Sequence, residues 1–210
     1  MKYTLLIFLW IIWCSFHSFL ASHAAGDYFK CRMGSGFVFY RLFYNLTALI
    51  TFIPLVLYTH SLKGDVLFRW EGFLVYVQIF LGLISLFLLI AGLLKYDALQ
   101  FAGLRQVLSG KSYSSISESG EIVSTGILGV IRHPWYLCGI IFIWICYRNL
   151  YLSTLLVNLL LTIYFYLGTR LEERRLIREY GESYRDYMKK VSMLIPIKWI
   201  LKRFTRSSGN

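Results

Sequence analysis

The residues best suited to chemistry lie in two short stretches, and the first is an Arg-His-Pro-Trp-Tyr sequence that begins at Arg132. Pro134 suits the first turn of a helix, where the free backbone N–H groups favour an anion. His133 can accept a proton, and Arg132 can orient an anionic group. The alternative is that these residues are ordinary membrane-surface anchors, with Trp135 and Tyr136 in an aromatic belt.

The second stretch places two neighbouring carboxylates, Glu172 and Glu173, just after Arg170. Two carboxylates beside an apolar run are costly at a membrane boundary unless cations compensate them. The alternative to a binding site is therefore salt bridging along one helix, to Arg170, Arg174 or Arg175. Neither stretch identifies a reaction by itself, and each depends on the elements that position it.

The chain that carries these two stretches is more apolar than a soluble protein. Of the 210 residues, 57% are hydrophobic, whereas soluble domains contain roughly 45–50%. Intrinsic disorder is excluded because 18% of the residues are aromatic and only 16% are charged. The composition therefore predicts a membrane protein of one domain.

The formal net charge is +11, which indicates an anionic partner. Beside long apolar runs, an anionic membrane surface fits better than a nucleic acid, because no zinc-finger, RNP or helix-turn-helix pattern accompanies the basic residues. The four cysteines form no CxxC pair and no His/Cys cluster with zinc spacing, so no metal site is predicted.

Five apolar runs predict an all-α, polytopic membrane protein with about five transmembrane helices. They cover residues 3–26, 37–60, 72–94, 127–147 and 150–169. For the first run, a signal peptide is the alternative, but its apolar stretch exceeds the usual signal length, which favours a retained helix. With five spans and the N-terminus outside, 18 Lys and Arg side chains lie inside and 4 outside, which predicts a cytoplasmic C-terminus.

Two predicted inside segments are too long to be simple connections. Residues 95–132 form a loop rich in Gly and Ser, and loops of that length are usually functional or disordered. From Leu171 onward, apolar residues recur every three or four positions, which predicts a C-terminal amphipathic helix on the membrane or over a site. The chain is thus divided into a three-helix membrane region (1–94), a catalytic region (95–196) and a basic tail (197–210).

In this order the motifs resemble the isoprenylcysteine carboxyl methyltransferase superfamily. The block runs over residues 122–196, from Val-Ser-Thr-Gly through Arg-His-Pro-Trp-Tyr and a short helical hairpin to Glu-Glu and Tyr-Gly-x-x-Tyr-x-x-Tyr. Upstream, Phe16-His17-Ser18 and Gly103-Leu104-Arg105-Gln106 are similar to the branch that contains NnrU-like proteins and membrane methanethiol S-methyltransferases.

The resemblance implies a membrane methyltransferase with S-adenosyl-L-methionine as cofactor and a small thiol or other lipophilic molecule as acceptor. The implied cofactor-binding residues are Gln106, Ile122, Val123, His133, Pro134, Tyr136 and Glu172. Methyl transfer depends on alignment and exclusion of water, and the residues predicted to assist it as catalytic groups are Arg132, His133 and Arg170. His17, a lone polar residue in an apolar run, is a weaker candidate for the substrate pocket.

Two departures from the family pattern bear on the substrate. Leu128 stands where the prenylcysteine enzymes have a Tyr, and Arg170 is out of register with the Arg that they use for the substrate carboxylate. Alternatives therefore remain open: a prenylcysteine or lipid carboxyl methyltransferase, a membrane reductase that uses a nicotinamide cofactor, and a non-catalytic NnrU-like accessory protein. A bacterial inner membrane is the expected location.

Overall fold

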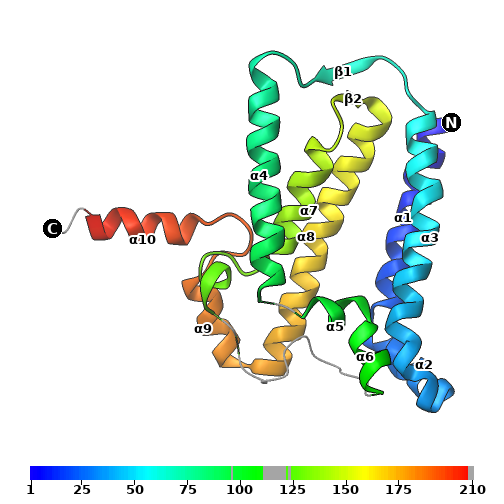
Figure 1. The fold of residues 1–210 in the computed structure, drawn as a ribbon, viewed down its shortest axis with the longest axis vertical. Helices are drawn as coiled ribbons and strands as arrows, with labels where there is room; N and C mark the ends of the chain where they lie inside the picture. The colour runs from blue at the N-terminus through cyan, green and yellow to red at the C-terminus, as the bar shows by residue number, and fades with distance from the viewer. Residues whose placement is uncertain (96, 111–121, 123, 208–210) are drawn as a thin grey trace. The chain divides into compact units, whose positions relative to one another are not determined.

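The computed structural model describes residues 1–95, 97–110, 122 and 124–207, and it is predominantly helical over them (Figure 1). The helices are α1 (Lys2–Leu20), α2 (His23–Met33), α3 (Tyr40–Ser61), α4 (Phe73–Leu93), α5 (Ala98–Ala102), α6 (Leu104–Ser109), α7 (Pro134–Ile145), α8 (Leu152–Tyr180), α9 (Glu182–Lys190) and α10 (Ile197–Ser207). Two 3-10 turns, η1 (Gly34–Phe39) and η2 (Gly126–Gly129), and a sheet of two strands, β1 (Val66–Arg69) and β2 (Asn149–Tyr151), are the other described elements.

Within the described residues, four helical stretches are long and apolar enough to cross a membrane. They are Lys2–Leu20, Ala24–Ser61, Phe73–Leu93 and Leu152–Tyr180. The second of these runs through α2, η1 and α3. The predicted all-α, polytopic membrane fold is confirmed, and four of the five predicted runs match α1, α3, α4 and α8.

The chain forms two compact units. In the first unit, α1 packs along α3, and the two helices are joined by neutral hydrogen bonds. The buried indole of Trp10 donates to Thr59 Oγ1 at 3.0 Å, and Trp13 donates to Thr51 Oγ1 at the same distance. Polar side chains of α3 then hold α5: Arg41 donates to the carbonyl of Gln100 at 3.0 Å.

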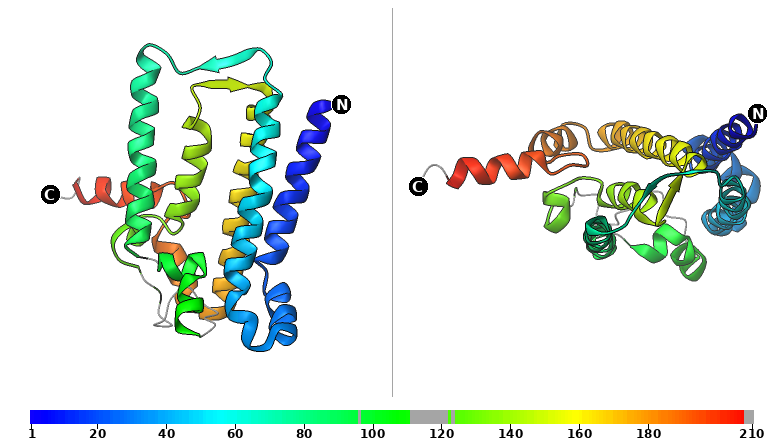
Figure 2. Two further views of the ribbon diagram at one scale, coloured as in Figure 1. Left: turned by 45° about the vertical axis from the view of Figure 1, so that its right-hand side comes forward. Right: turned by 90° about the horizontal axis from the view of Figure 1, so that it is seen from above.

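The second unit contains α4, α7, the later part of α8, α9 and α10. Helices α4 and α7 lie side by side (Figure 2) and approach closely because Gly92 faces the indole of Trp135. Helices α7 and α8 form the predicted hairpin. There Gly139 lies against the ring of Phe165, and a Cβ at this glycine would come within 3.1 Å of that ring. Small residues thus permit the close helix packing that membrane proteins need.

The fourth predicted run, residues 127–147, is helical over a shorter stretch than expected. Helix α7 begins only at Pro134 and has 12 residues, about 18 Å of helix, which is shorter than a hydrocarbon layer of ~30 Å. The cause is local: the residue before a proline is disfavoured in the helical region, and His133 has a non-helical backbone with φ −124° and ψ 67°. The prediction of a full-length helix here is wrong.

The amphipathic C-terminal region also differs from the single helix expected after Leu171. Helix α8 continues to Tyr180, and the chain then turns at Gly181, whose φ of +57° is accessible mainly to glycine. Helix α9 follows, and the segment 197–210, predicted as a basic tail, contains the helix α10. The division into 1–94, 95–196 and 197–210 stays a prediction. Residues 96, 111–121 and 123 of the predicted loop lie outside the described residues.

Candidate functional site

Two segments far apart in sequence meet at the start of α7. Ile131 forms a parallel β-bridge with Ser192. The backbone N–H of Arg132 donates to the Ser192 carbonyl at 2.9 Å, and that of His133 donates to the Met193 carbonyl at 3.1 Å. This short pairing fixes the backbone that carries the predicted Arg-His-Pro stretch.

The side chain of Arg132 is buried, with 7% of its surface exposed, and is fully engaged by this C-terminal region. Its Nε donates to Glu173 Oε1 at 2.8 Å, and its Nη2 contacts the same oxygen. Its Nη1 donates to the Met188 carbonyl at 3.2 Å and to the Val191 carbonyl. A buried guanidinium requires such partners, and removal of one partner of a buried pair is strongly destabilising.

His133 lies between two carboxylates. Its Nε2 is 3.3 Å from Glu173 Oε1, and its Nδ1 is 3.7 Å from Glu172 Oε2. The imidazole is 5% exposed, whereas Glu172 keeps about a quarter of its side chain exposed. The ring is therefore held from both sides, and Glu172 also borders open space where a ligand can reach it.

One oxygen of this cluster offers a free acceptor. Among the residues that the structure describes, Glu173 Oε2 is buried and has no hydrogen-bond partner, although Oε1 receives Arg132 and His133. An unsatisfied buried carboxylate oxygen is costly. A ligand that brings an N–H or O–H donor to Oε2 would remove this cost.

Tyr136 continues the site along α7. Its ring meets His133 edge to face, with centroids 5.6 Å apart, and Phe165 of α8 in the same way at 6.2 Å. A Cβ at Gly168 would lie 3.0 Å from the Tyr136 ring, so α8 presents a glycine where this ring packs. Pro134 is the first helical residue, as predicted, and is fully buried.

Two tyrosines of α9 close the site from the other side. Tyr187 donates from its hydroxyl to the Leu128 carbonyl at 2.5 Å, and Tyr184 is only 3% exposed. Burial raises the pKa of Tyr187 to about 12, and burial likewise raises the pKa of Tyr184 well above its usual value. Both hydroxyls therefore stay neutral at physiological pH, and Leu128 is held by its backbone.

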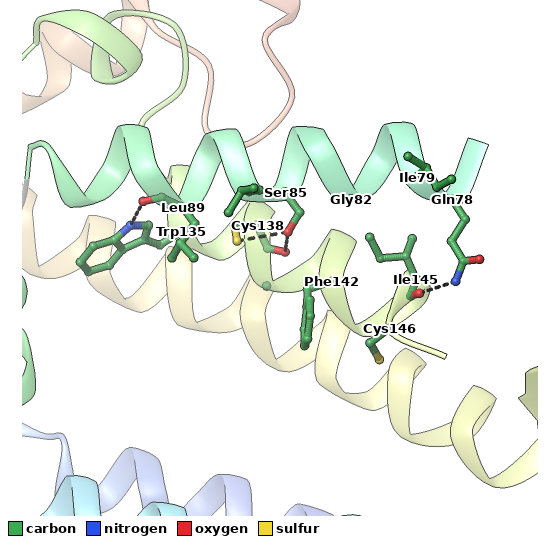
Figure 3. Close-up of a pocket in the computed structure, with 12 residues that line it drawn as sticks. Gln78, Ile79, Gly82, Ser85, Leu89, Trp135, Cys138, Phe142, Ile145 and Cys146 are labelled. Carbon is green, nitrogen blue, oxygen red and sulfur yellow. Dashed lines mark hydrogen bonds between the residues drawn. The ribbon is translucent and has the colours of Figure 1, made fainter. Parts of the chain in front are cut away.

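A groove of about 620 Å³ runs between α4 and α7 (Figure 3). Its polar side chains bond to backbone carbonyls: Ser85 Oγ donates to the Cys138 carbonyl at 3.2 Å, and Gln78 donates to the Ile145 carbonyl at 2.7 Å. Trp135, two residues from His133, stands at one end of the groove. The remaining surface is apolar, so the groove suits a lipophilic molecule.

The chain is similar to a known protein family over most of its length. A sequence model of the family described as NnrU protein matches residues 5–194, which is nearly the whole chain. The chain belongs to the NnrU protein family. This confirms the branch predicted from the upstream motifs.

Individual relatives of this NnrU-family chain are methyltransferases. It is 39% identical over 67 residues to a methanethiol S-methyltransferase of Pseudomonas deceptionensis, covering 32% of this chain and 25% of the relative. It is 44% identical over 66 residues to methanethiol S-methyltransferase 1 of Bradyrhizobium diazoefficiens, covering 31% and 23%. A protein-S-isoprenylcysteine O-methyltransferase of Schizosaccharomyces pombe is 35% identical over 100 residues, covering 43% and 42%.

The matches span about a quarter of the length of the two thiol methyltransferases and less than half of the third relative. They are therefore local similarities, whereas the family match extends over most of the NnrU-family chain. No solved structure matches the chain.

The structure brings together only part of the predicted site. In the NnrU-family chain, Glu172 and Tyr136 lie beside His133, which Arg132 and Pro134 flank in the sequence. Arg170 lies on α8 with its side chain exposed. No contact among the described residues joins it to this cluster. Ile122 is half-buried outside any regular element, and Val123 lies outside the described residues.

Two other predicted residues belong to the first unit. His17 stacks on the Trp13 ring with centroids 5.3 Å apart and planes parallel within 1°. Gln106 is buried and donates from Nε2 to the Gln100 carbonyl at 3.1 Å. Among the described residues, His17 Nδ1 and Gln106 Oε1 have no hydrogen-bond partner. Their predicted ligand roles stay predictions.

The sequence did not lead us to predict the central role of Glu173 in the site. The prediction assigned the cofactor to Glu172 and left Glu173 to pairing within its own helix, yet Glu173 is the carboxylate that joins Arg132 and His133. A helical signal was present: Glu173 follows the buried Thr169 by four residues and so shares its inward face. The hairpin return predicted from the sequence supplies the partner.

Proposed function

We propose that this NnrU-family chain is an integral membrane methyltransferase that uses S-adenosyl-L-methionine and acts on a small thiol or another lipophilic acceptor. The observation that carries the proposal is the cluster of His133, Glu172 and Glu173 beside the start of α7, in which one buried carboxylate oxygen lacks a donor. The methyltransferase names of the local relatives support the reaction class.

The described residues fit this cofactor in charge and in hydrogen bonding. The cofactor is a cation that carries an amino group and two ribose hydroxyls, and carboxylates accept from such donors. Glu172 and Glu173 Oε2 are the acceptors here, and Pro134 and Tyr136 would lie against the apolar parts. Gln106, Ile122 and Val123 are proposed as further cofactor contacts.

When bound, the cofactor supplies an electrophilic methyl group. The chain's contribution is alignment, exclusion of water and handling of one proton. With its Nε2–H directed to Glu173, the neutral His133 ring keeps Nδ1 unprotonated, and Nδ1, which is 3.7 Å from Glu172, can receive the proton that a thiol loses. Arg132 is a positioning residue, because Glu173 and two backbone carbonyls occupy its donors.

The acceptor is proposed from the groove between α4 and α7 and from the two departures noted in the sequence. An apolar groove that ends at Trp135 admits a lipophilic molecule from the bilayer. Arg170 has no described contact with the cluster around His133, and Leu128 has no polar side-chain atom, so neither is placed to bind a prenylcysteine carboxylate there. We therefore expect a small thiol to be methylated faster than a farnesylcysteine analogue.

Two measurements test the proposal. Calorimetry of the detergent-purified protein should show binding of S-adenosylhomocysteine and no binding of NADPH. Glu172→Gln should weaken this binding, whereas Glu179→Gln, on the same helix, should leave it unchanged. Binding of NADPH alone would indicate a reductase, and binding of neither would indicate a non-catalytic accessory protein.

An assay with labelled S-adenosyl-L-methionine then compares methanethiol with the farnesylcysteine analogue. More product from methanethiol is expected. Product from the prenylated compound alone would overturn the choice of acceptor and leave the methyltransferase proposal in place. Either result assigns the acceptor class independently of cofactor binding.

The proposed orientation follows from the distribution of basic residues, counted with residues 127–147 as one of five crossings, of which α7 (Pro134–Ile145) supplies the helical part. We propose a bacterial inner-membrane protein with its C-terminus in the cytoplasm, where a water-soluble cofactor is available. Reporter fusions after Ser61, after Lys111 and at Asn210 test this topology. A periplasmic signal at Asn210 would contradict it.

A further inference from the structure

The C-terminal helix α10 has an apolar face that is exposed. Four large side chains recur at intervals of three and four residues, the spacing of a single helix face. They are between 39% and 68% exposed: Ile197, Ile200, Leu201 and Phe204. A contiguous exposed apolar stripe of this kind is typical of a surface that binds a membrane or another protein, and we call that binding partner its cover.

The flanks of α10 are basic. Lys202 and Arg203 are exposed, and the Arg203 guanidinium lies over the Trp199 ring, 4.5 Å from its centroid. Residues 197–210 contain no Asp or Glu. The cover must therefore be apolar in its interior and anionic at its surface, which is the chemistry of a bilayer that contains anionic lipids.

The direction of α10 agrees with this cover. Helices α4 and α10 belong to the same unit, and both views show α10 running crosswise to α4 (Figures 1 and 2). Because α4 is long and apolar enough to cross a membrane, a helix crosswise to it runs along the membrane plane. We propose that α10 lies on an anionic membrane surface, with Lys202 and Arg203 at the lipid phosphates.

The same helix is tied to the candidate site through its first turn. The backbone N–H of Lys198 donates to Ser192 Oγ at 3.0 Å, and Lys198 Nζ donates to the Met188 carbonyl at 2.6 Å. That carbonyl also accepts from Arg132 Nη1. Docking of α10 on the membrane therefore stabilises the segment that pairs with Arg132 and His133.

Hydrogen–deuterium exchange of the full-length protein tests the proposal. The protein is placed as a single copy in nanodiscs of phosphatidylcholine alone or of phosphatidylcholine with phosphatidylglycerol. Backbone amides of α10 should exchange about tenfold more slowly with the anionic lipid, since each basic residue strengthens binding to such a surface. The amides of Arg132 and His133 should slow as well.

Variants that remove basic charge from α10 distinguish an anionic lipid surface from other possible covers of its apolar face. Lys202→Gln with Arg203→Gln should abolish the difference between the two lipids, whereas the control Lys30→Gln with Arg32→Gln, on α2, removes the same charge and should preserve it. Fast exchange in both nanodiscs would overturn the proposal, because α10 would not be docked. Slow exchange that is equal in both lipids and unaffected by the variants would overturn it too, because the cover would then be another part of this chain or uncharged lipid.

Discussion

The two units bury polar side chains in different ways. In the first unit, neutral pairs such as Trp10 with Thr59 join α1 to α3, and each pair needs one hydrogen bond. In the second unit, a guanidinium, an imidazole and a carboxylate are buried together at Arg132, His133 and Glu173. Neutral pairs are enough to hold membrane helices. Buried ions cost more free energy, so their retention points to a site.

The largest effect should follow from removal of one buried charge. Arg132→Met leaves Glu173 with His133 as its one remaining described partner and should lower the free energy of unfolding by about 3–5 kcal/mol. Unfolding in detergent measures this change. The double variant Arg132→Met with Glu173→Leu should recover part of the loss, and Arg170→Met on the exposed face should change little. Equal losses from Arg132→Met and Arg170→Met would contradict the assignment of a buried pair.

The next effect concerns close packing in the second unit. A Cβ at Gly92 would lie 2.1 Å from Trp135 Nε1, so Gly92→Ala should destabilise the protein by about 1–3 kcal/mol through overpacking. At Gly26, in α2, a Cβ has no neighbour within 4 Å, and Gly26→Ala should be neutral or stabilising. Thermal unfolding compares the two variants. Recovery of Gly92→Ala by Trp135→Phe would confirm the steric cause.

A smaller effect should appear in the pH dependence of stability. Burial raises the pKa of Tyr187 from 10.0 to about 12. Between these two pH values the folded protein keeps the Tyr187 proton, whereas the unfolded chain loses it. This stabilisation is complete below pH 10 and is lost as the pH rises toward 12. Tyr187→Phe should cost about 1 kcal/mol at pH 7, from the lost hydrogen bond to Leu128, and should reduce the slope between pH 10 and 12. An unchanged slope would show that Tyr187 does not contribute to it.

The smallest effect is expected at a neutral pair. Thr51→Val removes the acceptor of the half-buried Trp13 indole at nearly constant side-chain volume, so that little besides this hydrogen bond is lost. The loss of stability should be about 0.6 kcal/mol, and binding of S-adenosylhomocysteine should not change. A loss of binding in a normally folded variant would instead connect the first unit to the site.

The sequence predicted those parts of the fold that depend on local composition. Uninterrupted apolar runs predicted α1, α4 and the membrane part of α8, and Pro134 predicted the start of α7. The predicted length of α7 was wrong because residues 127–131 are as apolar as a helix, although they form a 3-10 turn and a short bridge instead. They are held by pairing with Ser192, which depends on tertiary structure.

The site was predictable in its residue types and less so in its pairing. His133 and Glu172 were expected at one place, and they are 3.7 Å apart. The link from Arg132 to Glu173 requires the hairpin of α7 and α8, and the link to the Met188 carbonyl also requires the chain to reverse at Gly181 and bring α9 back. The four-residue spacing from Thr169 favours Glu173 as the inward carboxylate, but no local pattern specifies its partner.

Photolabelling measures the location of the cofactor site most directly. Labelled S-adenosyl-L-methionine is cross-linked to the purified protein by ultraviolet light, and the labelled peptides are mapped by mass spectrometry. The label should appear on peptides that contain His133 to Tyr136 or Glu172, should be competed by S-adenosylhomocysteine, and should fall in Glu172→Gln but not in Glu179→Gln. Competed label confined to peptides without these residues would contradict the proposed site.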